Sequence, residues 1–359
     1  MKHTFVLRAW QAGCLALCLV FLAQLFSGAQ TLERLYPAIG ARYESDLTKE
    51  QITAALLWQG GPDNGDGISA SFWRQDPLHA KTPTAPERST AATAIGFCGG
   101  ADDCYAATYL NGAAPGSGDT TGCAVSQALA WALWGSTDVV GMTLTLSPAP
   151  QAQEGAYTPP ATNFYVRGVF AETDAVVLYG ADASAGFPNV ELAGVPRDDP
   201  AASAQHFLSG AGLGTPAWTL YGPQLAGFAR VLCWLPLVLA GLGLLVALLQ
   251  TTRHWPALWR DAAWFLLAMA AAALLPCALA ALPGWMIPSR WSDFSFWSDL
   301  GKNLTACWQD WQNAAPLQKD MVAKNAMRQT IGWLAATLLC AAAAFRLLCV
   351  KTRPKQPQD

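Results

Sequence analysis

The sequence predicts an α-helical membrane protein with four transmembrane helices and a large α+β extracytoplasmic domain between helices 1 and 2. Four long runs without a charged residue occupy residues 9–32, 231–252, 262–289 and 329–345. About 20 apolar residues in a helix cross a bilayer, so each run is a candidate span. The first two runs are separated by nearly two hundred residues, whereas the last three lie close together. This spacing predicts one large water-facing domain after the first span.

The runs divide the chain into nine segments. These are a cytoplasmic N-terminus (1–8), helix 1 (9–29), the extracytoplasmic domain (30–225), helix 2 (226–250), a short cytoplasmic link (251–260), helix 3 (261–283), a Trp-rich extracytoplasmic loop (284–328), helix 4 (329–350) and a cytoplasmic tail (351–359). The first run also allows a second interpretation, because Ser27, Gly28 and Ala29 resemble the cleavage site of a signal peptide. Cleavage would leave three spans, but the length of the run favours a retained helix.

Basic residues near the helix ends predict that both termini are cytoplasmic, because such residues accumulate on the inner side of a membrane. They are Lys2 and Arg8 before helix 1, Arg253 and Arg260 in the link, and Lys351, Arg353 and Lys355 after helix 4. Residues 30–225 hold 8 basic and 19 acidic side chains, which fits an outward-facing domain. This distribution gives no sign of nucleic-acid binding.

The domain holds a short cysteine loop, Cys98 to Cys104, which predicts a disulfide in an oxidising compartment. A metal site that also uses Asp102 and Asp103 is the alternative, although the spacing matches no zinc pattern.

Local patterns predict a mixed α and β domain. A helix is expected from Asp46 to about Trp58 and another over residues 126–134. Strands are expected at 68–73, 93–97, 142–146, 164–170, 176–178 and 190–192, with a Gly-rich loop at 112–121.

One block of the domain resembles a known family. Residues 122–135 (GCAVSQALAWALWG), 138–141 (DVVG) and 165–170 (YVRGVF) resemble the end of the periplasmic core domain in MacB/FtsX-type ABC transporter permeases, of the type VII superfamily, and 110–112 resembles its preceding segment. In that family a small-residue strand enters a helix ending in Leu-Phe-Gly, and a turn and a return strand follow. The resemblance covers residues 93–192, and the order of the spans extends it to the whole chain.

The cytoplasmic link departs from this family. Its permeases follow helix 2 with a basic segment containing Glu-Ile-Gly that binds the ATPase, whereas this link lacks that motif and contains Pro256. The candidates for ATPase coupling are Arg253, His254, Trp255, Trp259 and Arg260.

The loop before helix 4 is rich in aromatic residues. Trp285, Trp291, Phe294 and Trp297 lie just outside a predicted span, where such rings favour the membrane interface. They could instead form a docking surface for the large domain or a partner, with Trp308 and Trp311 on a following helix.

The sequence contains no recognisable catalytic motif. It has no phosphate-binding Gly-x-x-x-x-Gly-Lys-Ser/Thr loop, and its four histidines show no metal-ligand spacing. No cofactor is expected in this chain. The resemblance therefore implies a permease subunit in the lipid bilayer, partnered by an ATPase chain that holds ATP and Mg²⁺ and by a second permease chain in a homo- or heterodimer. A scaffold or sensor that has lost ATPase coupling is the alternative, and a membrane enzyme has little support.

Overall fold

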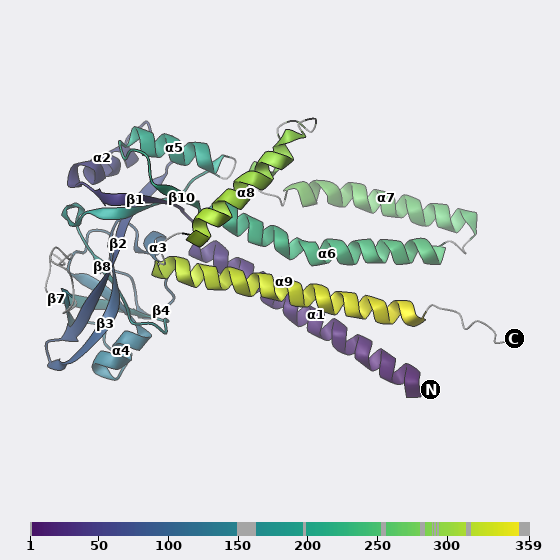
Figure 1. The fold of residues 1–359 in the computed structure, drawn as a ribbon, viewed down its shortest axis with the longest axis horizontal. Coiled ribbons are helices and arrows are strands. Elements are labelled where there is room, and N and C mark those ends of the chain that lie inside the picture. Colours follow the sequence, from purple (N-terminus) through teal and green to yellow (C-terminus); the bar gives the residue numbers. More distant parts are fainter. Residues whose placement is uncertain are drawn as a thin grey trace. The chain divides into compact units, whose positions relative to one another are not determined.

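The structure is a computed structural model that describes residues 2–148, 163–196, 199–252, 256–280, 284–288, 290, 292, 294–313 and 317–351. The chain forms two compact units (Figure 1). The helical unit comprises Met1–Arg34, Gln224–Trp291 and Val322–Asp359. The sheet unit comprises Leu35–Pro223 and Ser292–Met321.

The sheet unit is built on a mixed ten-stranded sheet within the described residues. Its strands are β1 (Ile39–Leu47), β2 (Ser69–Thr82), β3 (Ala85–Cys98), β4 (Tyr109–Gly112), β5 (Gly122–Ser126), β6 (Thr143–Pro148), β7 (Asn163–Phe170), β8 (Val176–Gly180), β9 (Phe187–Ala193) and β10 (Trp218–Tyr221). They follow the order β10-β1-β9-β2-β3-β8-β5-β7-β4, and β6 pairs with both β2 and β7. The β3–β8 and β5–β7 pairs are parallel, and the others are antiparallel.

Strand β6 closes part of this sheet into a ring. Because β6 joins β2 to β7, the pairing returns to its start through β3, β8 and β5. Apolar side chains fill the ring from alternate positions of its strands, as the two-residue period of a strand requires. The rings of Phe164 and Tyr179, for example, are 5.2 Å apart in this core, beside the buried Leu144. The strands predicted at 142–146 and 164–170 are confirmed as β6 and β7, which pair antiparallel.

The remaining strands, β10, β1 and β9, extend the sheet beyond the ring. Two helices, α2 (Lys49–Gln59) and α5 (Pro200–Gly210), cover one face of this extension with buried side chains such as Ile52 and Phe207 (Figure 1). The short α3 (Ala101–Cys104) contacts β2 and β9. The other face of the extension carries buried polar side chains, among them Arg42 on β1 and Glu191 on β9.

The start of α2 differs from the prediction. Asp46 lies in β1, not at the cap of the helix, and forms an ion pair with Arg74 at 3.1 Å. The cap is Thr48, whose side chain accepts from the Gln51 backbone N–H while the Gln51 side chain accepts from the Thr48 N–H. This reciprocal pair satisfies two backbone donors at the helix start, which explains why the helix begins there.

The helix predicted at 126–134 is confirmed as α4 (Gln127–Trp134). The Ser126 hydroxyl accepts from the Leu129 N–H, and Gly135 ends the helix with a φ of 69°. A positive φ of this kind favours glycine, so the Trp-Gly end has a local cause. Strands β1, β4 and β10 and helix α5 were not predicted.

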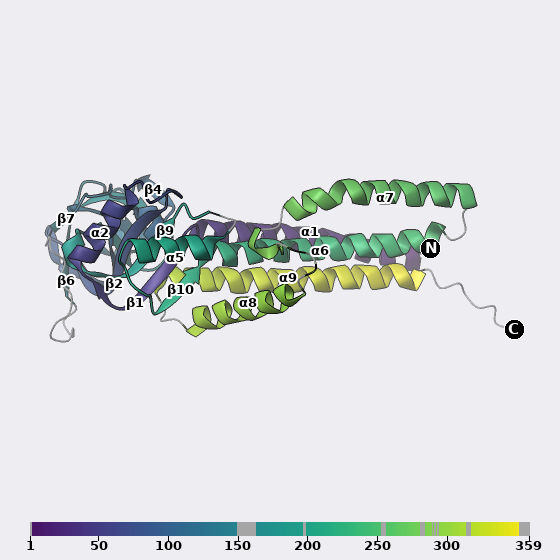
Figure 2. The same ribbon diagram turned by 90° about the horizontal axis from the view of Figure 1, so that it is seen from above.

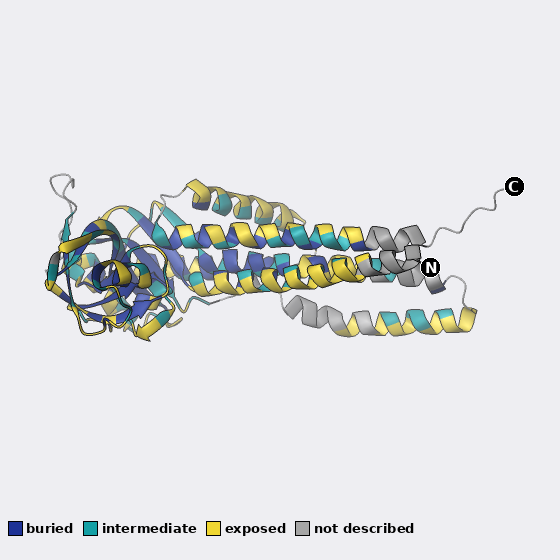
Figure 3. Cartoon of the chain, turned by 90° about the horizontal axis from the view of Figure 1, so that it is seen from below, coloured by how far each residue is buried: buried dark blue, intermediate teal, exposed yellow. Residues whose placement is uncertain are grey.

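The helical unit contains α1 (Lys2–Leu35, up to Arg34), α6 (Gly222–Thr252, from Gln224), α7 (Ala257–Ala280), the 3₁₀ turn η2 (Gly284–Met286) and α9 (Gln318–Lys351, from Val322). Helices α1, α6 and α9 run side by side (Figures 1 and 2). Phe21 on α1 stacks on Trp333 of α9 at 5.5 Å, and the Cys233 thiol on α6 donates to the Leu25 carbonyl at 3.7 Å. Exposed positions run along these helices, whereas the strands are mostly buried (Figure 3).

Two stretches among the described residues are long and apolar enough to cross a membrane. They are Ala12–Leu35 in α1 and Gly222–Gly243 in α6. They overlap predicted spans 1 (9–29) and 2 (226–250).

The closest approach of α1 and α9 depends on Gly28. A Cβ atom there would lie 2.5 Å from Oγ1 of Thr330, so replacing Gly28 with Leu must push the two helices apart. We expect Gly28→Leu to lower the free energy of unfolding of the full chain in mild detergent by about 1–3 kcal/mol, the usual effect of overpacking. Gly13→Leu is the matched control, because a Cβ there meets nothing within 4 Å. Equal thermal stability of the two variants would contradict this packing.

Candidate functional site

A carboxylate lies buried in the middle of the sheet unit. Glu191 is on β9, between β1 and β2, and its neighbours Val190 and Leu192 face the apolar core. Side chains alternate along a strand, so Glu191 faces the other side of the sheet. There Oε1 accepts from Nη2 of Arg42 at 2.7 Å and from Nε1 of Trp73 at 3.1 Å. All three side chains are buried, so this is a polar cluster inside the domain.

Two tryptophan rings enclose the guanidinium of Arg42. Its Cζ lies 5.1 Å from the ring centroid of Trp73 and 5.6 Å from that of Trp218, distances at which a cation is attracted to a ring face. Gly40, two residues earlier on the same face of β1, leaves the space, because a Cβ there would lie 2.7 Å from Nη1 of Arg42. The local sequence Gly-Ala-Arg therefore places the charge against Glu191.

The second cation comes from the first turn of α9. Nζ of Lys319 lies 3.1 Å from Oε2 of Glu191 and donates to the backbone carbonyl of Asp103 at 2.7 Å. The preceding residue, Gln318, donates its backbone N–H to Oε1 of Gln75 at 2.7 Å. A helix start has backbone N–H groups without partners inside the helix, and here the sheet unit supplies one.

The next residue of α9, Asp320, is buried as well. It accepts from the Tyr36 hydroxyl at 2.8 Å, and that hydroxyl accepts from Nε1 of Trp311 at 3.2 Å. Trp311 belongs to α8 (Ser295–Asn313), and all three side chains are buried. The other carboxylate oxygen, Oδ2 of Asp320, has no hydrogen-bond partner within the described part of the chain.

We call Tyr36, Arg42, Glu191, Lys319 and Asp320 the helix joint, because they lie within the sheet unit close to where three long helices leave or enter it. Helix α1 ends at Leu35, directly before Tyr36. Helix α6 begins at Gly222, where a Cβ would lie 2.4 Å from the Ala38 carbonyl oxygen and 2.9 Å from Cβ of Tyr36. Helix α9 begins with Gln318, Lys319 and Asp320. The parts of these three helices that belong to the sheet unit therefore lie beside the joint.

Electrostatics keep the joint charged. Desolvation alone would raise the pKa of Glu191, but Arg42 and Lys319 outweigh it, so the pKa of this carboxyl is lowered. Burial disfavours the charged form of Arg42, yet Glu191 and Asp320 outweigh that effect and raise the pKa of the guanidinium. Burial, and then Asp320, raises the pKa of Tyr36, which remains a neutral hydrogen-bond donor.

Sequence reasoning did not find the joint. The available signals were a single acidic residue between Val190 and Leu192 in an apolar strand, and the adjacent pair Lys319 and Asp320. A charge in a strand usually faces water, so nothing local distinguished Glu191 from a surface residue.

The predicted disulfide between Cys98 and Cys104 is wrong, since both cysteines are free. Cys98 ends β3 and packs against the same core as the ring, whereas Cys104 is buried in the cluster with Trp73 and Ile95. The helical turn of α3 carries the second thiol to the opposite face of the sheet. The two residues therefore do not converge, and within the described residues no group of three or more His, Cys, Asp or Glu side chains could hold a metal ion.

The predicted coupling link is described only in part. Arg253, His254 and Trp255 lie outside the described residues. Trp259 at the start of α7 is 68% exposed, and Arg260 pairs with Asp261 at 3.6 Å.

The predicted interface aromatics are not gathered at the joint. Trp285 is half-buried in η2, Trp291 lies outside the described residues, and Phe294 and Trp297 are exposed. The expected helix with Trp308 and Trp311 is present as α8, and only its Trp311 reaches the joint.

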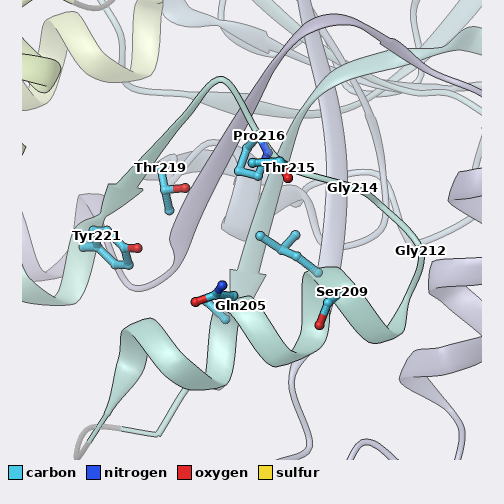
Figure 4. Close-up of a pocket in the computed structure, with 10 residues that line it drawn as sticks. Gln205, Ser209, Gly212, Gly214, Thr215, Pro216, Thr219 and Tyr221 are labelled. Atoms are coloured by element: carbon cyan, nitrogen blue, oxygen red, sulfur yellow. The ribbon is translucent and has the colours of Figure 1, made fainter.

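A pocket of about 510 Å³ lies between α5 and β10 (Figure 4). Its polar lining includes Gln205, Ser209, Thr219 and Tyr221, and no lining side chain carries a charge. The Ser209 hydroxyl donates to the His206 carbonyl at 3.0 Å. This pocket offers no general base or activated nucleophile among its lining residues.

Removal of the Glu191 charge tests the joint. Glu191→Gln leaves Arg42 and Lys319 buried beside a neutral group, and breaking a buried ion pair costs about 3–5 kcal/mol. Denaturant unfolding of the full chain in detergent measures this loss. Lys302→Met is the control, because its pair with Asp299 is exposed and such pairs contribute less than about 1 kcal/mol. A similar small effect of both substitutions would argue against a buried network.

The same variant gives a pH signature. Because the pKa of Glu191 is lowered from 4.5, its charge stabilises the fold above that pH, and the contribution is lost as pH falls through the lowered pKa. Glutamine resembles the protonated form, so the difference in unfolding free energy between wild type and Glu191→Gln should shrink below pH 4.5. A difference that stays constant down to acid unfolding would contradict the assignment.

Comparisons with known proteins find likenesses among solved structures alone. No protein-family model matches this sequence, and no curated protein matches it. Similar solved structures include the extracellular domain of the ABC-type transporter YknZ from Gram-positive bacteria (15% identity, TM-score 0.36, covering 51% of this chain and 96% of that chain). They also include the periplasmic region of MacB from Actinobacillus actinomycetemcomitans (10%, 0.38, 54% and 92%) and a domain of a protein described as a permease from Porphyromonas gingivalis (14%, 0.32, 48% and 82%).

Proposed function

We propose that this chain is a permease-like membrane subunit of a MacB/FtsX-type ABC system, which transmits motion driven by a separate ATPase to its extracytoplasmic domain, for export or mechanotransmission. Its family-like block supports this assignment. The small-residue strand β5 leads into α4, the helix ends at Gly135, and β7 returns beside β5 in parallel. This is the order of elements that the family has in the corresponding block.

The membrane topology of the proposal has four spans. The apolar stretches in α1 and α6 supply two of them. Helices α7 and α9, which cover predicted spans 3 and 4, supply the others, with both termini in the cytoplasm. The sheet unit then lies outside the cytoplasm.

The observation that carries the mechanism is the contact between Lys319 and Glu191. A helix transmits a displacement to a domain only if its end is fixed there. The first turn of α9 is fixed at three points: Gln318 to Gln75, Lys319 to Glu191 and Asp320 to Tyr36. A movement of α9 would therefore act directly on β9, whereas a flexible linker would absorb it.

The partners follow from the same proposal. An ATP-binding cassette ATPase would hold ATP and Mg²⁺, and a second permease chain would complete the dimer. The contact to the ATPase would lie in the cytoplasmic link, where Leu258 and Trp259 are 80% and 68% exposed. Exposed large apolar side chains beside a charged residue such as Arg260 are suited to a protein contact.

A second candidate function is a scaffold or sensor that keeps the architecture without ATPase coupling. The short link without Glu-Ile-Gly favours it. The neighbouring genes discriminate between the two, because an adjacent ATP-binding subunit supports the permease and its absence supports the scaffold.

Purification of the full chain in mild detergent, followed by a nucleotide-hydrolysis assay, tests the proposal. We expect an ATP-binding cassette subunit and a second permease chain to co-purify. Trp259→Ala with Arg260→Gln should reduce the amount of bound ATPase severalfold, since an exposed aromatic anchor is typically worth more than about 1 kcal/mol at an interface. Arg290→Gln, on the proposed outer side, is the control. Repeated purification without any ATPase or second permease chain would refute the proposal that this chain is a permease subunit.

A further inference from the structure

Helix α8 carries a continuous apolar stripe. Residues of the stripe recur three or four positions apart, as expected for one face of a helix, and they are Phe296, Trp297, Leu300, Leu304, Cys307, Trp308 and Trp311. The charged residues Asp299, Lys302 and Asp310 lie on the other face. Helix α8 is therefore strongly amphipathic.

The stripe is covered unevenly. At its C-terminal end Trp311 is fully buried in the helix joint and meets Trp308 edge to face at 5.5 Å. At its N-terminal end Trp297 is 52% exposed, with its ring perpendicular to that of Phe296 at 5.4 Å, and the preceding Phe294 is 83% exposed. In the part of the chain that the structure describes, the N-terminal end of the stripe therefore lacks a cover.

Chain lengths allow the N-terminal end of α8 to reach the bilayer. The apolar run of α9 starts at residue 329, eleven residues after Gln318, so about 17 Å of helix separates the joint from the membrane surface. Helix α8 has 19 residues and is about 28 Å long, which is enough to return from Trp311 to that level. At its other end, 14 residues connect α8 to Ala280 of α7, the proposed third span.

We propose that Phe294, Phe296 and Trp297 insert into the outer membrane–water interface, so that α8 acts as a strut between the bilayer and the helix joint. The inference rests on the four-span topology of the proposed function. Aromatic rings favour this zone of the bilayer, where one side is apolar and the other is wet. A second copy of the chain or a soluble partner would be the other possible covers.

Charge identifies the kind of lipid. Lys302 is the only basic residue of α8 and pairs with Asp299 at 3.3 Å, whereas Asp310 adds a negative charge. A helix that binds anionic lipid through electrostatics needs several basic residues. The insertion therefore uses apolar area, and zwitterionic phosphatidylcholine is sufficient for it.

Fluorescence quenching in vesicles tests the strut. Phe294→Cys in the full chain is labelled with an environment-sensitive fluorophore and reconstituted into phosphatidylcholine with or without a lipid that carries a nitroxide near the headgroup. We expect a blue-shifted emission that this lipid quenches. The control is Trp131→Cys, because Trp131 is also exposed (55%) but lies on α4, which packs on β3 and β5, whereas α8 contacts β10. The label at residue 131 should show neither a blue shift nor quenching. The wild-type chain, treated with the same fluorophore, gives the background from its native cysteines.

A third label separates the strut from the topology. Leu19→Cys on α1, at a 68% exposed position, should be quenched by a nitroxide deep in the acyl chain if the first span is in the bilayer. Quenching at residue 19 without quenching at residue 294 overturns the strut and leaves the topology standing. No quenching at residue 19 overturns both. A label at residue 294 that is shielded from iodide in water but not quenched by lipid shows a protein cover instead, and also overturns the strut. Trp297→Cys repeats the measurement if Phe294→Cys does not fold.

Discussion

The burial of Glu191 between Arg42 and Lys319 is the interaction on which the rest of the structure depends. Taking three charges out of water is costly, and a buried ion pair is on average no better for stability than apolar side chains of the same size. What it does supply is a single permitted geometry, because any displacement of Lys319 leaves a buried carboxylate short of a partner. Gly40, Trp73 and the Asp103 carbonyl all serve that geometry. The network is therefore best understood as fixing the start of α9 to β9.

The sheet unit has two parts, the ring and its extension. The ring closed by β6 holds most of the apolar core, and the extension formed by β9, β1 and β10 holds the polar cluster on one face and helices α2 and α5 on the other. Tyr36 and Gly222 bring the ends of α1 and α6 to the same extension that receives α9. Under the proposed function, helix attachments gathered on one set of strands are what would carry a displacement of the helices into the domain.

Sequence reasoning predicted the fold where local signals were strong. The helix at Gln127–Trp134 has a serine cap and a terminal glycine, β6 and β7 alternate clearly, and β8 is a short apolar run. Sequence reasoning failed where contacts between distant parts of the chain determine the structure. Strand β2 was expected to end at Trp73 but continues to Thr82 through polar residues, because β3 and β6 pair with it on either side. Cys98 and Cys104 were paired on spacing alone, and a helical turn between them defeats that inference. The joint joins residues up to 284 positions apart, such as Tyr36 and Asp320, so no local pattern could reveal it.

Hydrogen exchange at the start of α9 tests the central claim most directly. Lys319→Gln with Asp320→Asn removes one positive and one negative charge from the joint and leaves the pair between Arg42 and Glu191 intact. Lys302→Gln with Asp299→Asn makes the same change in charge at an exposed pair of α8. In the full chain, the account predicts that amide exchange over residues 318–330 becomes much faster in the first variant and stays as in the wild type in the second. Wild-type protection in both variants would contradict it, because the helix start would then be held by something other than the buried charges.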